Sequence, residues 1–452
     1  MCGISGIISL SGQKLDNIKD RIEVMSNLLD HRGPDQKGVF ISEDQNFGLC
    51  NNRLSIVAPD QSFKLPFTKN NNEFLSFNGE IYNYFEIKKN LEKKGIKFET
   101  DCDTEVLYEF LIQENLKNLS SLNGVWSFAF YNKKNHSLSL CRDLMGEKQL
   151  FFKIEGDQLL FSSEVKPIIA VSQNKNDFDF ESLIYSWKFN TSSTTKTLIK
   201  GIEKLKPGTL LNLKDGKIYK EESQRLEPEK WLTFFHNNPS KKEISKKFEE
   251  IFNKEVLIRL PKDVPFNTPL SGGIDSSILA IFIKNFVKKF KTFFTISYAG
   301  QLEKEKITGL SEVENSKRLS KMLSTDHEIF NIKNFSFDDE LKFAAKNAFE
   351  GCICTGLGIY SVMAKFLREK NFKVIMFAEG PDEFLGGYEA DIDSFKIDNS
   401  FIKKINLKFL KFFTQFDFIK NAIIKKLNLK KNKEFEFSYD PFYTRPNHLV
   451  CS

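Results

Sequence analysis

The 452-residue sequence has no long apolar run, and no stretch of it approaches the roughly 18 uninterrupted apolar residues of a membrane-spanning helix. Its first residues also lack a basic segment followed by an apolar core, which would mark a signal peptide. With 40% hydrophobic and 28% charged residues, the composition is typical of a globular protein. We therefore predict a cytoplasmic protein without a transmembrane segment.

Cysteine is scarce, and the seven cysteines lack the spacing of a disulfide framework, which favours reduced thiols. Cys352 and Cys354 form a close pair, but no second pair completes a zinc site. Internal repeats and low-complexity segments are also missing. Because the formal net charge of +6 is slight for this length, we predict no nucleic-acid partner.

The chain changes in pattern along its length. Residues 1 to about 215 alternate short β-rich runs with turns, with helical stretches near 20–31 and 103–115, which predicts an α+β domain with packed antiparallel sheets. An Asp-Gly pair at 215–216 predicts a tight turn between two strands. From about Lys241, strands alternate with helices, which predicts an α/β domain with a mainly parallel sheet. We place the two domains at 2–215 and 241–452, with a polar linker at 216–240.

The strongest local motif is PLSGGIDSS at 269–277. An apolar strand ends at Leu270, two glycines allow a tight turn, and a helix begins at the serines, so backbone N–H groups and the helix dipole converge on one point. This arrangement favours phosphate binding. It is not a Walker A loop, because no Gly-Lys-Ser/Thr follows, and Asp275 suits magnesium on a pyrophosphate.

A second acidic motif, EGPDEFLGGY at 379–388, follows the strand-like run KVIMFA. Ligands of open parallel sheets collect at the carboxyl ends of the strands, so we expect this loop to face the first one. Asp382 would then complete the magnesium shell, and Glu379 would contact a substrate or a proton. Taken alone, an acidic turn of this kind is more often simply solvated.

The sequence starts MCGISGIISL, with a cysteine directly after methionine. Most cysteines are buried packing residues or inert thiols, and terminal residues are usually poorly ordered. A cysteine that becomes the mature N-terminus is instead a candidate nucleophile. The residues of this stretch alone leave both interpretations open.

Seven motifs stand in the order found in glutamine-hydrolysing asparagine synthetases, which the sequence resembles from residue 1 to about 390. They are Cys2-Gly3-Ile4, HRGPD at 31–35, RLSIV at 53–57, NGEIYNY at 78–84, DTEV at 103–106, SGGIDSS at 271–277 and EGPDEFLGGY at 379–388. The resemblance implies an N-terminal-nucleophile glutaminase domain, followed by an ATP-pyrophosphatase synthetase domain that receives ammonia through an internal tunnel.

In the glutaminase half, the resemblance implies that methionine is removed and that Cys2 attacks the side-chain amide of glutamine, with its own α-amino group as base. Asn78 and Gly79 resemble the oxyanion hole of the family. Arg53 and Asp103 match the partners of the α-carboxylate and the α-ammonium of glutamine. The rest of the glutamine pocket is matched by Leu54, Ile56 and Glu80.

In the synthetase half, the resemblance implies that ATP adenylates the β-carboxylate of aspartate and that ammonia then displaces AMP. Asp275 and Asp382 would hold Mg²⁺, and Glu379 matches an acidic residue close to the reacting carboxyl. The positions assigned to ATP are Leu270, Ser271, Gly272, Gly273, Asp275, Ser276, Ser277, Ile296, Phe377 and Ala378. The expected products are asparagine, glutamate, AMP and pyrophosphate, with ATP and Mg²⁺ as cofactors.

Two other interpretations stay open. Related amidotransferases amidate other carboxylates, including sugar acids of surface polysaccharides, and the motifs do not identify the acceptor. A glutaminase remnant or a non-catalytic binding partner is the third reading. The last part of the chain is the reason to retain this third interpretation, because nothing after Tyr388 matches the lysine-bearing region of the family. Lys403, Lys404 or Arg445 would have to take the place of the family's lysine.

The Lys/Phe-rich segment 401–435 has apolar residues at helical spacing, which indicates a packed helix pair with its lysines on the solvated face. The alternative, a helix on an anionic surface, is the less favoured one. The sequence does not fix the oligomeric state, and a homodimer is one option.

Overall fold

The computed structural model describes residues 1–189, 191–287, 292–298, 312–332 and 357–385, together with five single positions between 290 and 349. Segment 401–435, the pair Cys352 and Cys354, and the basic residues Lys403, Lys404 and Arg445 lie outside the described residues. The chain divides into two compact units after Phe377, so the described part of the second unit, from Ala378 to Leu385, is treated by itself.

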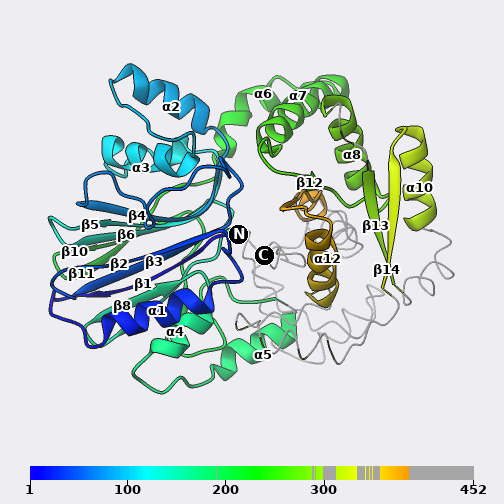
Figure 1. Cartoon of the computed structure of the whole chain (residues 1–452). Coiled ribbons are helices and arrows are strands. Elements are labelled where there is room, and N and C mark those ends of the chain that lie inside the picture. The colour runs from blue at the N-terminus through cyan, green and yellow to red at the C-terminus, as the bar shows by residue number, and fades with distance from the viewer. Residues whose placement is uncertain are drawn as a thin grey trace, which may run out of the picture. The chain divides into compact units, whose positions relative to one another are not determined.

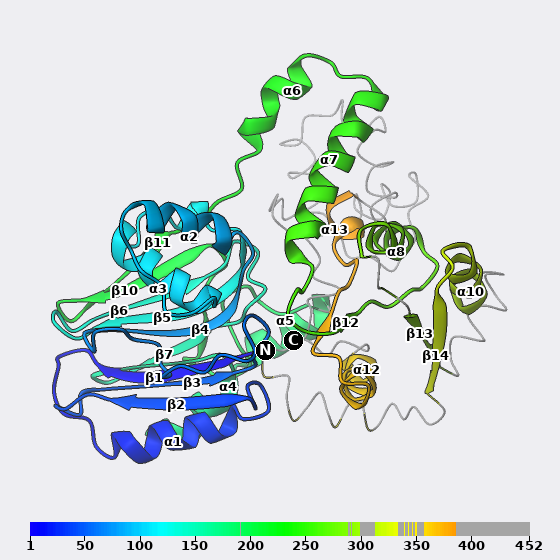
Figure 2. The same cartoon turned by 45° about the horizontal axis from the view of Figure 1, so that its top comes forward.

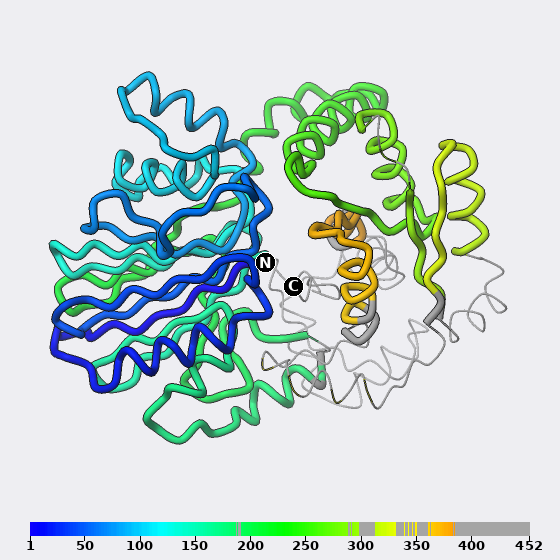
Figure 3. Tube along the Cα trace, in the orientation of Figure 1, coloured from blue at the N-terminus to red at the C-terminus, as the bar shows by residue number. Residues whose placement is uncertain are grey.

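Eleven strands among the described residues build two antiparallel sheets. They are β1 (Gly3–Ser9), β2 (Gln36–Ile41), β3 (Phe47–Arg53), β4 (Glu73–Ile81), β5 (Gly124–Asn132), β6 (Ser137–Arg142), β7 (Phe151–Glu155), β8 (Gln158–Ser162), β9 (Glu203–Lys204), β10 (Thr209–Lys214) and β11 (Lys217–Glu222). The larger sheet has the order β2-β3-β1-β8-β7-β9, and the smaller one has the order β11-β10-β6-β5-β4. The trace in Figure 3 shows β1 and β3 side by side, as their antiparallel register requires.

Helices cover the outer faces of the two sheets, so this region has four layers, helix, sheet, sheet and helix (Figure 1). The helices and short 3-10 turns of the region are α1 (Ile18–Leu28), α2 (Tyr84–Lys93), α3 (Asp103–Glu114), η1 (Leu119–Ser121), α4 (Val165–Val171), α5 (Phe180–Phe189), η2 (Pro228–Trp231) and α6 (Leu232–His236). α1 and α4 pack on the larger sheet, whereas α2 and α3 pack on the smaller one. The predicted α+β domain with packed antiparallel sheets is confirmed.

The first strand is central to this packing. Because neighbouring side chains of a strand point to opposite faces, Ile4 and Ile8 pack between the sheets while Ile7 packs with the α1 layer. All seven residues of β1 are buried. Hydrogen bonds to β3 on one side and β8 on the other hold the strand, so the residue before it is anchored at the end of a rigid element.

The described remainder of the first unit mixes helices with parallel strands. Its elements are α7 (Lys241–Arg259), β12 (Phe266–Asn267), α8 (Ile274–Phe286), β13 (Thr292–Tyr298), α10 (Glu312–Met322), β14 (Asp326–Ile332), α12 (Leu357–Glu369) and β15 (Val374–Ile375). β12 pairs with β15 and β13 pairs with β14, both in parallel, and a parallel bridge joins Pro269 to Phe294. Figure 2 shows β13 and β14 side by side with α10 next to them. The predicted parallel pairing is confirmed.

The structure differs from the sequence analysis in the length of the smaller sheet and in one additional helix. β11 pairs with β10 within the smaller sheet, so this sheet includes residues beyond 215. α2 was not among the predicted helical stretches, which were placed near 20–31 and 103–115, and it begins at Tyr84 shortly after β4 ends at Ile81. Within the described part of the chain, no helix is both long enough and apolar enough to cross a membrane.

Candidate active site

Cys2 directly precedes β1 and contacts the segment that follows β3. The Leu54 N–H lies 3.4 Å from Cys2 Sγ, and the thiol lies 3.7 Å from the Leu54 carbonyl oxygen. The register pairs Gly3 with Asn52, and this pairing brings the first and third motifs together. The structure thus places the candidate nucleophile next to the candidate glutamine-binding residues Arg53 and Leu54.

The HRGPD segment (31–35) holds Cys2 and the loop after Arg53 through hydrogen bonds. Arg32 donates from Nε to the Cys2 carbonyl oxygen at 2.9 Å and pairs through Nη1 with Glu164 at 3.0 Å. Asp35 accepts a hydrogen bond from the Ser55 N–H at 2.8 Å. The motif therefore positions the candidate nucleophile and the loop after Arg53, and we assign it no direct contact with substrate.

Burial controls the protonation state at the N-terminus. It lowers the pKa of the Met1 terminal amine to about 5 and raises the pKa of the Cys2 thiol. Both shifts favour the neutral forms. This amine belongs to Met1, whereas the Cys2 nitrogen is part of a peptide bond in the unprocessed chain.

Asn78 and Gly79 lie on β4, opposite Ser127 and Trp126 of β5. Asn78 is fully buried, and its Nδ2 donates to Ser127 Oγ at 3.4 Å. Among the described residues, its Oδ1 has no hydrogen-bond partner. A Cβ atom at Gly79 would lie 2.2 Å from the Val125 carbonyl oxygen, so only glycine fits there. Strand pairing fixes both candidate oxyanion-hole residues in place.

Asn51 is a residue that the sequence analysis missed. Its Nδ2 donates to the carbonyl oxygens of Gly3 at 3.3 Å and Phe77 at 3.4 Å, and its Oδ1 accepts from the Phe77 N–H at 3.2 Å. Gly3 follows Cys2 and Phe77 precedes Asn78, so one side chain couples the two candidate groups. No sequence signal marked Asn51, because its role comes from hydrogen bonds to residues distant along the chain.

Arg53 is 6% exposed, and carbonyl groups of the following loop hold its guanidinium. Nη1 donates to the Gln61 carbonyl oxygen at 2.8 Å, and Nη2 donates to that of Val57 at 2.9 Å. The guanidinium carbon lies 4.5 Å from the centroid of the Phe63 ring. The cation therefore keeps one orientation, as recognition of a carboxylate requires. Leu54 and Ile56 are half-buried beside it.

Asp103 and Glu80 supply negative charge. Asp103 accepts a hydrogen bond from the Ile81 N–H at 3.1 Å, which places its carboxylate beside Glu80. Burial raises the pKa of Asp103 to about 6. Burial and the nearby Asp103 charge raise the pKa of Glu80 to about 7. Removing such carboxylates from water is costly until a cation arrives, so the pair suits an ammonium ligand.

These pKa values predict a pH-dependent affinity for glutamine. As the pH falls, Glu80 becomes protonated near pH 7 and Asp103 near pH 6, and each loses the charge that attracts an ammonium group. KM for glutamine should therefore be constant above about pH 8 and rise steeply below about pH 6. Steady-state glutaminase kinetics across this range measure it, and a flat KM would contradict the assignment.

The SGGIDSS segment connects β12 to α8, and Gly273 caps the helix. Ser271 Oγ lies 2.9 Å from Ser276 Oγ and accepts a hydrogen bond from the Gly273 N–H at 3.2 Å, while Ser277 Oγ donates to the Gly273 carbonyl oxygen at 2.6 Å. Gly272 has φ +78°, and a Cβ atom there would lie 2.5 Å from Asn315 Cβ. The structure therefore has a tight turn at the start of a helix, as the sequence predicted for this segment, and phosphate binding there stays a prediction.

The strands next to this loop carry the other predicted nucleotide positions of the first unit. Leu270 is fully buried and donates from its N–H to the Phe294 carbonyl oxygen at 2.8 Å. Ile296, on β13, and Phe377, after β15, belong to one apolar cluster. Leu270, Ile296 and Phe377 therefore lie on neighbouring parallel strands or directly after them.

Asp275 lies in the first turn of α8. Within the described residues, no group of three or more His, Cys, Asp or Glu side chains could hold a metal ion. Mg²⁺ is usually held by one or two carboxylates together with substrate phosphates, so a single aspartate beside a phosphate loop fits it. The other predicted ligand, Asp382, belongs to the second unit, in which Ala378 and Glu379 precede α13 (Pro381–Leu385).

Comparison with known protein families matches almost the whole chain. Residues 1–224 match the family model of the glutamine amidotransferase domain, and residues 247–444 match that of asparagine synthase. The chain belongs to the glutamine-hydrolysing asparagine synthetase family. The four-layered region falls within the match to the glutamine amidotransferase domain, and the parallel strands fall within the match to asparagine synthase.

Curated members of the family are similar over most of this chain. Glutamine-hydrolysing asparagine synthetase 1 of Bacillus subtilis (strain 168) is 31% identical over 407 residues, which are 86% of this chain and 59% of that protein. Synthetase 3 of the same organism is 29% identical over 441 residues, or 90% of this chain and 69% of that protein. Amidase chry2 of Gibberella zeae is 26% identical, over 86% of this chain and 60% of that protein. The chain thus spans about three fifths of the length of the first relative.

Proposed function

We propose that this protein hydrolyses glutamine at Cys2 and transfers the ammonia to a carboxylate that ATP has adenylated, with aspartate as the acceptor. The observation that carries the proposal is the contact of Cys2 Sγ with Leu54, which puts a terminal thiol beside Arg53. Membership of the family supports the two half-reactions and their order along the chain.

In the first half-reaction, the free amine of Cys2 takes the proton of the thiol, and the thiolate attacks the side-chain amide of glutamine. Asn78 and Gly79 stabilise the negative oxygen of the tetrahedral intermediate. The proton passes to the departing ammonia, and water hydrolyses the glutamyl thioester to glutamate. Arg53 binds the α-carboxylate, Asp103 and Glu80 bind the α-ammonium, and Leu54 and Ile56 line the pocket.

In the second half-reaction, the acceptor carboxylate attacks the α-phosphate of ATP, pyrophosphate leaves, and ammonia displaces AMP from the acyl-adenylate. The loop from Ser271 to Ser277 binds pyrophosphate through its N–H groups, and Leu270, Ile296, Phe377 and Ala378 bind the adenosine. When bound, Mg²⁺ supplies charge that neutralises the phosphates, and Asp275 and Asp382 would hold it. Glu379 lies near the acceptor in this proposal.

The mechanism requires that Met1 is removed, since the amine of Cys2 is otherwise part of a peptide bond. The mature protein should therefore have a mass lower by one methionine residue and begin at Cys2. Intact-mass spectrometry and N-terminal sequencing of active protein test this prediction. Full glutaminase activity in protein that keeps Met1 would contradict it.

A second acceptor is the alternative, and one relative supports it. Amidase chry2 does not carry the name of an asparagine synthetase, although it is similar over 86% of this chain. A different carboxylate in the acceptor position would leave the roles of Cys2 and Asp275 unchanged. We further propose a cytoplasmic location, which the scattered cysteines support, with a homodimer as one option. The glutaminase domain then extends past residue 215 to include β11.

Product analysis tests the proposal. Purified protein is incubated with glutamine, Mg-ATP and aspartate, and glutamate, AMP, pyrophosphate and asparagine are quantified together. Asparagine and AMP in equal amounts are expected. If AMP forms only when another carboxylate replaces aspartate, the second acceptor is established. If glutamate is released but no carboxylate leads to AMP, the protein is the glutaminase remnant.

A further inference from the structure

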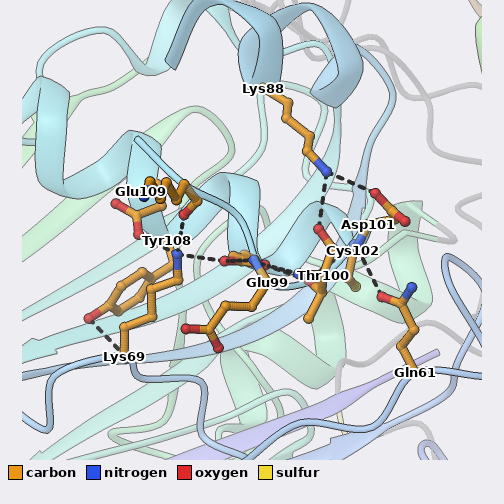
Figure 4. Close-up of polar contacts among 11 residues, drawn as sticks. Gln61, Lys69, Lys88, Glu99, Thr100, Asp101, Cys102, Tyr108 and Glu109 are labelled. Atoms are coloured by element: carbon orange, nitrogen blue, oxygen red, sulfur yellow. Dashed lines mark hydrogen bonds and ion pairs between the residues drawn. The ribbon is translucent and has the colours of Figure 1, made fainter. Parts of the chain in front are cut away.

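The segment before Asp103 is anchored on several sides (Figure 4). The carboxylate of Glu105 accepts hydrogen bonds from the N–H groups of Glu99 at 2.9 Å and Thr100 at 2.6 Å, and it pairs with Lys69 at 2.6 Å. Lys88 donates to the Thr100 carbonyl oxygen at 3.1 Å. The segment 99–102 is therefore fixed to the smaller sheet and its helices, and it presents Asp103 from a rigid base.

The segment after Arg53 is built differently, because its own backbone surrounds the guanidinium. Carbonyl oxygens of Val57 and Gln61 accept from Arg53 at 2.9 and 2.8 Å, and that of Ala58 accepts at 3.3 Å. Any displacement of the segment 57–61 therefore moves the cation with it.

Gln61 connects these two segments. Its backbone carbonyl oxygen binds Arg53, and its side-chain Oε1 accepts the Asp101 N–H at 2.9 Å. Figure 4 shows the Gln61 side chain directed at the segment that carries Asp101 and Cys102. Gln61 is thus bonded both to the candidate carboxylate-binding cation and to the segment that leads to the candidate ammonium-binding anion.

The two charges are close but are not paired with each other. Cys102 Sγ lies 3.6 Å from Arg53 Nη2 and 3.4 Å from Asp103 Oδ1. In the described part of the chain, Arg53 and Asp103 form no ion pair with one another. A fixed separation of this kind keeps a cation and an anion available for the two ends of an α-amino acid, whereas a collapsed pair would neutralise both.

We propose that Gln61 is a positioning residue that sets the separation between Arg53 and Asp103 and thereby makes the site selective for substrates with both an α-carboxylate and an α-ammonium group. The inference rests on the proposed glutaminase function. Gln61 itself does not take part in the chemistry at the thiol, so its effect is on binding and selectivity, and not on turnover.

Replacing Gln61 by methionine keeps its length but removes the acceptor for the Asp101 N–H. We expect KM for glutamine to rise about threefold to tenfold, the range for one hydrogen bond, with kcat within about twofold of the wild type. The preference for glutamine over its analogue without the α-amino group should fall by the same factor. Gln61→Glu keeps the acceptor oxygen and should retain that preference.

Gln13→Met is the matched control, because Gln13 is exposed and belongs to none of the site motifs. Circular dichroism of all variants checks the fold. A Gln61→Met enzyme with wild-type KM and selectivity would overturn the inference, as would a loss of kcat at unchanged KM. If the wild type releases no glutamate from glutamine, the proposed function fails, and the inference fails with it. An active wild type with an unaffected Gln61→Met variant instead overturns the inference alone, so the two failures are distinguishable.

Discussion

A Cys2→Ala variant is expected to lose glutamate release from glutamine by at least about 10⁴-fold, the scale of loss for a catalytic nucleophile. Alanine keeps the terminal amine but removes the sulfur that lies 3.4 Å from the Leu54 nitrogen. Synthesis driven by ammonium salts should persist, because ammonia then reaches the synthetase half without the thiol. Paired assays with glutamine and with ammonium chloride measure both activities.

Cys141→Ala is the control for this variant, since Cys141 is fully buried in the core next to α3 and distant along the chain from the motifs. It should retain both activities. A folded Cys2→Ala protein that still hydrolyses glutamine would remove Cys2 from the mechanism. Failure of that protein with ammonium salts as well would contradict two separable sites.

An Asp275→Ala variant is expected to show the opposite pattern. Formation of AMP should fall at least about 100-fold, because several kcal/mol of charge stabilisation at the phosphates are lost with a magnesium ligand. Hydrolysis of glutamine should continue, since Asp275 lies in the first turn of α8, whereas the glutaminase residues lie on β4, at the start of α3 and beside β1 and β3. Separate assays of AMP and glutamate distinguish the two effects.

Asp20→Ala provides the matched change on an exposed position of α1. It should leave both activities intact. If Asp275→Ala abolished glutamate release and AMP formation together while circular dichroism remained native, the two half-reactions would be coupled more tightly than proposed. Unchanged AMP formation would exclude Asp275 as a magnesium ligand.

Local sequence patterns predicted those elements whose conformation is set by a single local preference. The Asp-Gly pair at 215–216 forms the turn between β10 and β11, as the turn preference of this dipeptide requires. The DTEV helix starts at Asp103 as expected. α2 was missed because the strand residues of β4 run directly into it, and only packing against α3 and the smaller sheet decides where strand gives way to helix.

The candidate site was predictable only in part, for a physical reason. Cys2, Arg53 and Asp103 stand in recognisable motifs, and strand pairing brings Cys2 to Leu54. Asn51 and Gln61 have no such signal, because their importance comes from hydrogen bonds to residues 26 and 40 positions away in the sequence. The unusual pKa values of Asp103 and Glu80 likewise arise from burial, which a linear sequence does not display.

The central claim is that nitrogen passes from glutamine to an ATP-activated carboxylate within one chain. Glutamine labelled with ¹⁵N in its side-chain amide tests this claim most directly, with Mg-ATP and aspartate present and the products analysed by mass spectrometry. The account predicts ¹⁵N in the side-chain amide of asparagine, in amounts equal to the AMP formed. Label found only in free ammonia, with no AMP for aspartate or for any other carboxylate offered, would contradict it.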